Sequence, residues 1–389
     1  MNDFYHRRLL RAPRIATTLI FLVQGMGIGA WAVCVPTFRE TLGLSNSSLS
    51  LSLLAFAIGG LLGMPASAWL VSRLGSKSAT MLLALAYGIC IVLPALAPSL
   101  FTLVGAALLF GLSKGAVDVA MNTFGAAIQT NWRAPIMSSF HAAASSGGFF
   151  GAVWIGVVFA NGFEAFTGLL TLTVVSLVLV GAAIRLAIGA DVDAAHDQNA
   201  SAFAVPSSAL MGIGSLCFLV LLIEGAITDW SGVFMTTVVQ VTSAQAAAGF
   251  AAFSTLMVFG RVFGDWFVST MGPHFVVRFG AIMAAIGFTL ALVFASFGVT
   301  VLGFALVGLG ASNLFPLLLS AASEAKDVAP SVAIAMTATV GYSGFLIGPP
   351  MIGLASDHVG LRMALVCLLI AAVLIGAFGP KFIEAVKVT

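Results

Sequence analysis

Charged residues are unusually scarce in this sequence. Asp, Glu, Lys and Arg make up only 8% of its 389 residues, whereas hydrophobic residues make up 60%. Soluble domains carry about 25% charged residues, so this chain cannot present an ordinary water-facing surface. Lipid must be its solvent. The small net charge of +2 gives no reason to expect a nucleic-acid partner.

Cysteines and histidines are also scarce, and a nucleotide-binding P-loop is absent from the sequence. The four cysteines fall in apolar runs without metal-ligand spacing, so we expect them to be small packing residues and expect no metal site. The chain contains no P-loop, which argues against direct drive by ATP, and we expect no cofactor. The five histidines are scattered and form no nucleophile–base cluster. We therefore do not expect an enzyme.

Long apolar runs fill most of the chain. A membrane-spanning helix needs about 20 mostly apolar residues, and twelve such stretches can be placed. Their approximate limits are 15–36, 48–70, 78–97, 99–129, 135–160, 163–188, 209–236, 244–270, 275–296, 298–323, 330–355 and 360–380. The sequence therefore predicts an all-α integral membrane protein.

The distribution of Lys and Arg predicts the orientation in the membrane. With the N-terminus inside, twelve of the 16 Lys and Arg residues lie on the cytoplasmic side and two, Arg39 and Arg362, on the other. Lys114 and Arg261 fall inside predicted spans. Because cytoplasmic loops carry the excess of positive charge, both termini are expected in the cytoplasm.

The chain repeats itself after about half its length. Positions in the first half recur 197 residues later: Trp69, Val71, Ser72 and Gly75 as Trp266, Val268, Ser269 and Gly272. The same offset carries Gly111-Leu112 onto Gly308-Leu309 and Ser146-Gly147 onto Ser343-Gly344. Two tandem apolar halves are typical of secondary transporters.

A polar stretch separates the two halves. Asp191, Asp193, His196, Asp197 and Asn199 cluster before Pro206, and this composition suits a flexible tether. We predict a six-helix half at 1–188, a cytoplasmic linker at 189–208 and a second six-helix half at 209–389.

Together these features resemble the major facilitator superfamily. The turn between predicted spans two and three reads Ala68-Trp-Leu-Val-Ser72-Arg73-Leu-Gly75-Ser-Lys77, a partial match to the family pattern Gly-x-x-x-Asp-Arg-x-Gly-x-Arg/Lys. The stretch 259–274 is similar to the eighth span of fucose-permease-like symporters. Gly and Pro residues of span eleven resemble the rhizopine-permease-like (MosC-like) branch; they are Gly344, Gly348, Pro349, Pro350 and Gly353. The resemblance implies the major facilitator fold, with spans one, four, seven and ten lining a central cavity.

Predicted span four carries three polar residues at helical spacing. Lys114, Asp118 and Asn122 recur every four residues and so share one helix face. Asp118-x-x-x-Asn122 resembles the Glu-x-x-x-Asn stretch of fucose-permease-like proteins, whose acid is implicated in proton coupling. We expect Asp118 to couple protons and Lys114 and Asn122 to contact the solute. The alternative is a Lys–Asp pair that only neutralises itself.

Predicted span seven carries a second intramembrane acid. An ionisable side chain at mid-membrane costs about 2.5–3.5 kcal/mol or more, so it needs a reason to be there. We expect Glu224 to be a second proton-coupling residue, with a structural hydrogen bond as the alternative. Asp229 lies toward the external end and is expected to be a gate residue.

Other polar and aromatic residues complete the expected site. Gln24 and Trp31 share a face of span one, where an amide and an indole would suit a polyol or sugar. His141, Asn313 and Tyr342 are further candidate solute contacts. The alternative for Trp31 is an aromatic anchor at the membrane interface, and for His141 a hydrogen-bonded packing role.

Charges beside the cytoplasmic turns are expected to control gating. Arg261 and Asp265 are four residues apart and should pair. Family resemblance assigns them, with Arg73 of the turn after span two, to latching the protein in its outward-open state.

The expected function is proton-coupled symport of a small polar solute, such as a sugar, polyol or related metabolite, by alternating access. Proton-driven export of amphipathic compounds or drugs is the main alternative, since 31 phenylalanines would suit it. A non-transporting sensor or membrane-embedded enzyme is a remote one. We expect a monomer in a bacterial inner membrane, with the solute, protons and lipid as its partners.

Overall fold

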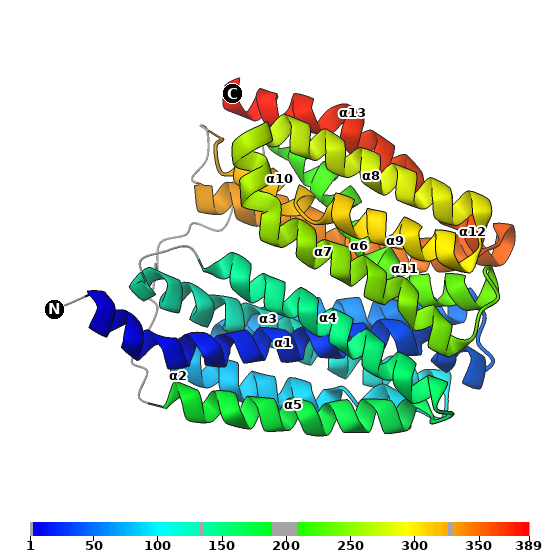
Figure 1. The fold of residues 1–389 in the computed structure, drawn as a ribbon, viewed down its shortest axis with the longest axis horizontal. Coiled ribbons are helices and arrows are strands. Elements are labelled where there is room, and N and C mark those ends of the chain that lie inside the picture. Colours follow the sequence, from blue (N-terminus) through cyan, green and yellow to red (C-terminus); the bar gives the residue numbers. More distant parts are fainter. Residues whose placement is uncertain (1–2, 133–135, 189–207, 326–329, 389) are drawn as a thin grey trace. The chain divides into compact units, whose positions relative to one another are not determined.

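Helices make up every secondary-structure element of the computed structural model, which describes residues 3–132, 136–188, 208–325 and 330–388 (Figure 1). The predicted all-α class is confirmed for these residues. The expected linker at 189–208 lies outside them, except for Ser208 at the start of a helix.

The first half of the chain forms five helices and a short 3₁₀ helix. They are α1 (Asp3–Thr41), α2 (Asn46–Cys90), η1 (Leu93–Leu96), α3 (Leu100–Trp132), α4 (Met137–Ala160) and α5 (Ala165–Ala187). The second half forms eight helices, two of them very short. They are α6 (Ser208–Thr237), α7 (Ser243–Met271), α8 (Pro273–Phe294), α9 (Phe297–Ala311), α10 (Leu314–Ala322), α11 (Pro330–Val359), α12 (Leu361–Ala364) and α13 (Val366–Val388).

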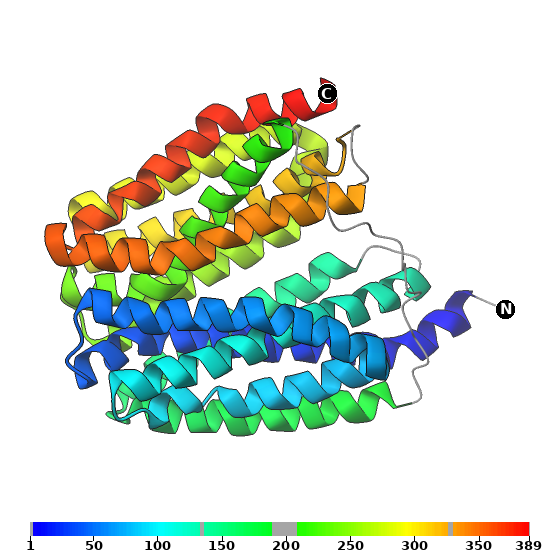
Figure 2. The same cartoon turned by 180° about the vertical axis from the view of Figure 1, so that it is seen from behind.

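The chain falls into two compact units. The first comprises Met1–His196 with Ser243–Ala247, and the second Asp197–Thr242 with Ala248–Thr389. In the first unit α1 packs along α4, and in the second α6 packs along α11. These pairs correspond under the sequence repeat. Figure 2 shows the same helices from behind, running from blue through green to red along the chain.

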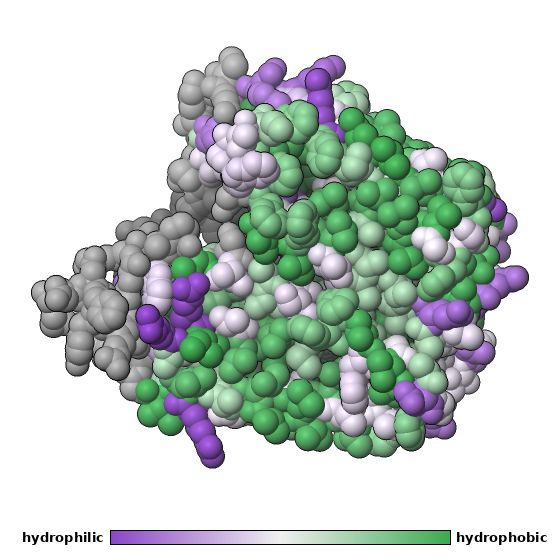
Figure 3. Space-filling model, in the orientation of Figure 1, coloured by the Kyte–Doolittle hydropathy of each residue, from purple (hydrophilic) through white to green (hydrophobic). Residues whose placement is uncertain are grey.

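Ten of the described helical stretches are long and apolar enough to cross a membrane. Their outward side chains are large and hydrophobic: Phe101 is 87% exposed and Trp69 61% exposed. Hydrophobic residues also dominate the face drawn in Figure 3. Because exposing such side chains to water is unfavourable, these faces are suited to lipid.

The repeat is also visible in the backbone. Gly75 has φ 78° and ψ 159°, and Gly272, 197 residues later, has φ 81° and ψ 156°. Only glycine adopts this conformation readily, so it ends one helical run and starts the next. Gly162 and Gly360, 198 residues apart, likewise share φ values of 77° and 79°.

Some helix boundaries differ from the prediction. The expected spans 48–70 and 78–97 belong to one element, α2, which continues through a kink at Gly75 as far as Cys90. That stretch reaches 51 residues with η1. The expected span 298–323 is interrupted instead, between α9 and α10. The backbone conformation departs from helical at Gly75 alone, and the turns on both sides of it stay helical. No loop therefore forms at 71–77.

Candidate functional site

The three polar residues predicted on span four lie together on α3. The Nζ atom of Lys114 donates to Oδ2 of Asp118 at 2.9 Å, and Asn122 Nδ2 donates to the Asp118 carbonyl oxygen at 2.8 Å. About a quarter of the Lys114 side chain and a fifth of the Asp118 side chain are exposed (24% and 20%). The pair is therefore close, charge-assisted and half-buried.

Glycines position α3 against α2. A Cβ atom on Gly111 would lie 1.9 Å from the Phe56 carbonyl oxygen, and one on Gly115 would lie 1.9 Å from that of Gly60. Only glycine permits this approach of two backbones. Because this face of α3 packs closely against α2, its polar face is left half-buried with Lys114 and Asp118.

The residues predicted on span one are more deeply buried than a solute contact requires. Gln24 is 8% exposed and Trp31 only 2% exposed. The hydroxyl of Tyr87 donates to the Gln24 carbonyl oxygen at 2.6 Å. The Trp31 ring stacks on Phe56, with ring centroids 5.4 Å apart and an angle of 15° between the ring planes. The indole N–H of Trp31 is buried without a hydrogen-bond partner.

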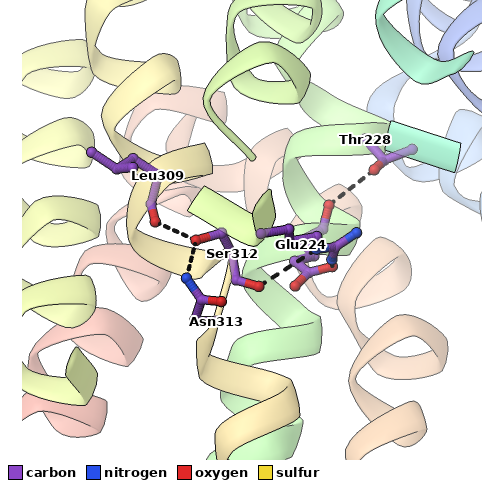
Figure 4. A network of polar contacts seen from close by, with 6 residues as sticks. Glu224, Thr228, Leu309, Ser312 and Asn313 are labelled. Atoms are coloured by element: carbon purple, nitrogen blue, oxygen red, sulfur yellow. Dashed lines mark hydrogen bonds and ion pairs between the residues drawn. The ribbon is translucent and has the colours of Figure 1, made fainter. Parts of the chain in front are cut away.

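In the second unit, Glu224 of α6 and Arg261 of α7 lie opposite each other. Their closest atoms, Oε2 and Nη2, are 3.7 Å apart, and the side chains are 17% and 25% exposed, respectively. The other carboxyl oxygen of Glu224, Oε1, is buried without a hydrogen-bond partner. Thr228 Oγ1 donates to the Glu224 backbone carbonyl at 3.0 Å, as Figure 4 shows.

The break between α9 and α10 contributes to the same site. Within a helix the Ser312 carbonyl would accept from residue 316, but Pro316 has no N–H. That carbonyl instead accepts from Arg261 Nε at 3.5 Å. Asn313 Nδ2 donates to the Gly260 carbonyl at 2.8 Å. It also donates to Ser312 Oγ at 3.0 Å, and Figure 4 marks this second bond.

Those bonds limit what Asn313 can offer a solute. Both hydrogens of its amide nitrogen are engaged, so only Oδ1 remains to accept a hydrogen bond. The predicted contact at Asn313 is thereby reduced to an acceptor. The same bonds hold the start of α10 against α7.

The remaining predicted residues lie in varied surroundings. His141 is exposed and meets Phe21 edge to face at 5.3 Å. Half-buried Tyr342 lies between the rings of Phe315 and Phe345, at 6.1 and 6.2 Å.

Three of the four predicted gating residues are described. Asp229 is 9% exposed. Arg73 is exposed, with its guanidinium 6.0 Å from the centre of the Trp69 ring. The side chain of Asp265 lies outside the described residues, so its expected pairing with Arg261 stays a prediction.

Three contributors to the site were not predicted from the sequence. Pro316 and the Ser312 carbonyl, which accepts from Arg261 Nε, had a readable signal: a proline four residues after a serine inside an apolar run. Tyr87 had none, since its contact with Gln24 joins residues 63 apart.

Comparison with known proteins identifies the family. The family model of the Major Facilitator Superfamily matches residues 17–349. An uncharacterized MFS-type transporter of Yersinia pestis is 34% identical, with 94% of each chain covered. The membrane protein MosC of Rhizobium meliloti is 31% identical, over 94% of this chain and 89% of MosC. The predicted resemblance to the MosC-like branch is confirmed.

Solved structures show the same fold. A bacterial homolog of the human lysosomal transporter Spinster superposes with a TM-score of 0.76 at 14% identity, covering 99% of this chain and 98% of that one. A mutant form of the nucleoside transporter NupG superposes with a TM-score of 0.73 at 16% identity, covering 96% of this chain and 100% of that one. The matched family consists of transporters and not of enzymes. This chain belongs to the major facilitator superfamily.

Proposed function

We propose that this transporter is a proton-coupled symporter of a small polar solute, such as a sugar, a polyol or a related metabolite, in a bacterial inner membrane. It would work by alternating access, so that the solute reaches one side of the membrane at a time. Twelve spans, cytoplasmic termini and a monomeric state belong to the same proposal.

The observation that carries the proposal is an acid–cation pair inside the spans of each unit. Asp118 meets Lys114 at 2.9 Å on α3, and Glu224 meets Arg261 at 3.7 Å between α6 and α7. Intramembrane charges are expensive and are by default functional. A chain that needed only packing would place apolar residues at these four positions.

Such pairs give a carboxylate two alternative ways to have its negative charge compensated. It can face its cation, or it can take a proton and release the cation. When the exposure of the carboxyl changes with conformation, proton binding favours one conformation over the other. Asp118 and Glu224 are therefore the proposed proton-coupling residues.

The charges also constrain the solute. The two intramembrane cations, Lys114 and Arg261, are outnumbered by three acids, Asp118, Glu224 and Asp265. Cations are therefore not in surplus. A site for organic phosphates would need surplus cations, which disfavours that class. Hydrogen-bonding groups such as the Asn122 side chain and Asn313 Oδ1 suit hydroxyl-bearing solutes.

The test is solute-dependent proton flux in proteoliposomes that enclose a pH-sensitive dye. Pools of sugars, polyols, amino acids and drugs are added to the outside at a fixed pH. The proposal predicts internal acidification with a pool of polar solutes and none with liposomes lacking protein. Uptake of labelled solute without any proton movement would contradict coupling to protons.

Export of amphipathic compounds is the second candidate, and 31 phenylalanines favour it. Everted and right-side-out vesicles separate the two directions. Under an inward proton gradient, as in cells, symport concentrates labelled solute in right-side-out vesicles. Under the same gradient, an exporter would deplete them, and everted vesicles acidified inside would accumulate the compound.

A further inference from the structure

The Glu224–Arg261 pair is looser than the pair in the first unit. Nη2 and Oε2 are 3.7 Å apart, whereas Lys114 Nζ and Asp118 Oδ2 are 2.9 Å apart. At 3.7 Å the groups attract each other but form no hydrogen bond. Closer approach would lower their electrostatic energy, so the other contacts of the guanidinium bear on this distance.

The structure shows a competing acceptor for Arg261. Its Nε atom donates to the Ser312 carbonyl at 3.5 Å, on the side of α9 and α10. That carbonyl is available because residue 316 is a proline and cannot supply the helical N–H. In the first unit the repeat places Val119 at the position of Pro316, and α3 continues there without a break.

Two glycines of α7 allow it to pack closely against the break between α9 and α10. A Cβ atom on Gly260 would lie 2.1 Å from Ser312 Oγ, and one on Gly264 would lie 2.0 Å from Asn313 Oδ1. Asn313 Nδ2 also bonds the Gly260 carbonyl. Glycines on either side of Arg261 thus bring its side chain within reach of the freed carbonyl.

We propose that Pro316 and the Ser312 carbonyl form a tether that shares Arg261 with Glu224 and keeps their ion pair loose. Pro316 is a positioning residue in this account, since it acts only through Arg261. The looseness leaves Glu224 Oε1 without a partner, available to a proton or to a solute donor. This inference rests on the proposed proton coupling at Glu224.

Within the described part of the chain, Glu224 takes part in one ion pair. Arg261 is the cation that the described ion pairs place against it. From α11, Phe345 packs against Gly225, and Tyr342 lies one turn before Phe345 with the two rings 6.2 Å apart. Asp229 lies five residues further along α6, and the side chain of Asp265 on α7 lies outside the described residues.

The test is Pro316→Ala, which restores an N–H for the Ser312 carbonyl and so withdraws it from Arg261. The matched control is Pro380→Ala in α13, which restores an N–H in the same unit on a helix without candidate site residues. Pro316→Gly restores the same N–H and replaces Pro316→Ala if that variant folds poorly.

The first readout does not depend on transport. The coupling between Glu224→Gln and Arg261→Gln is measured from melting temperatures of the purified full-length protein, in the wild-type, Pro316→Ala and Pro380→Ala backgrounds. The tether predicts a coupling that grows in Pro316→Ala, because Arg261 closes on Glu224, and that is unchanged in Pro380→Ala. An unchanged or smaller coupling in Pro316→Ala overturns the tether.

The second readout is the pH profile of solute-dependent proton flux. A tighter pair resists protonation, so Pro316→Ala should move the midpoint to lower pH, by about 0.5 unit or more. A midpoint that stays in place or moves to higher pH overturns the inference. If the wild type shows no flux, the proposed function fails, and the coupling measurement still decides the tether.

Discussion

At the scale of single residues, four of the chain's few intramembrane charges each lie against an opposite charge. Lys114 and Asp118 lie one helical turn apart, so their pairing follows from the sequence alone. Glu224 and Arg261 are 37 residues apart and meet only through the packing of separate helices. The first pair could be predicted from spacing; the second could not.

A double-mutant cycle tests the first pair. Asp118→Asn leaves the half-buried ammonium of Lys114 without its carboxylate, and Lys114→Gln leaves the carboxylate without its cation. We expect the double variant to be more stable than the sum of the two single losses predicts, with a coupling of about 1 kcal/mol. Thermal unfolding of the four purified proteins measures it. Strictly additive effects would show that the 2.9 Å contact contributes no stability.

At the scale of helices, glycine sets how closely the elements pack. In α1, a Cβ atom on Gly29 would lie 2.0 Å from the Gly148 carbonyl oxygen of α4. Glycine composition was visible in the sequence, but not which glycines face a neighbouring backbone. That distinction depends on helix rotation, which an almost uniformly apolar helix does not reveal.

Two matched substitutions test this packing. Gly29→Ala should destabilise the protein by about 1–3 kcal/mol, because α1 and α4 must move apart. Gly105→Ala in α3 places its methyl group where nothing lies within 4 Å and should be neutral or slightly stabilising. Melting temperatures in one detergent compare them. Equal effects at both positions would contradict the packing account.

Helix boundaries were predictable only in part. Hydropathy located the apolar stretches, but it placed a gap at 71–77 where α2 only kinks at Gly75. It also gave one continuous span at 298–323, where the helix is interrupted between α9 and α10, three residues before Pro316 in the first turn of α10. A proline early in a helix and a single glycine change the local hydrogen bonding without changing the mean hydropathy of the stretch. Hydropathy alone therefore reveals neither feature.

At the scale of the whole molecule, the sequence repeat predicted the architecture best. Gly75 and Gly272 adopt the same backbone conformation 197 residues apart, and α1 with α4 and α6 with α11 pack in corresponding pairs. The repeat did not predict the site chemistry, because the units differ there. Val119 in the first unit stands at the position of Pro316 in the second.

The proposed orientation is testable with single cysteines in a background that lacks the four native ones. Ser45 lies before α2 and Ser72 near its kink, both are exposed, and the positive-inside pattern assigns them to opposite sides. A membrane-impermeant maleimide added to intact cells should label Ser45→Cys and spare Ser72→Cys. In everted vesicles the labelling should reverse. Labelling of Ser72→Cys from outside would invert the proposed topology.

The measurement that tests the central claim most directly is proton flux in the carboxamide variants. Wild type, Asp118→Asn and Glu224→Gln are reconstituted side by side with a transported solute, and Glu164→Gln, at an exposed position between α4 and α5, is the control. The account predicts that solute-dependent flux falls at least about tenfold in one or both intramembrane variants, because a carboxamide cannot exchange a proton, and is kept in the control. Full flux in both intramembrane variants would contradict it.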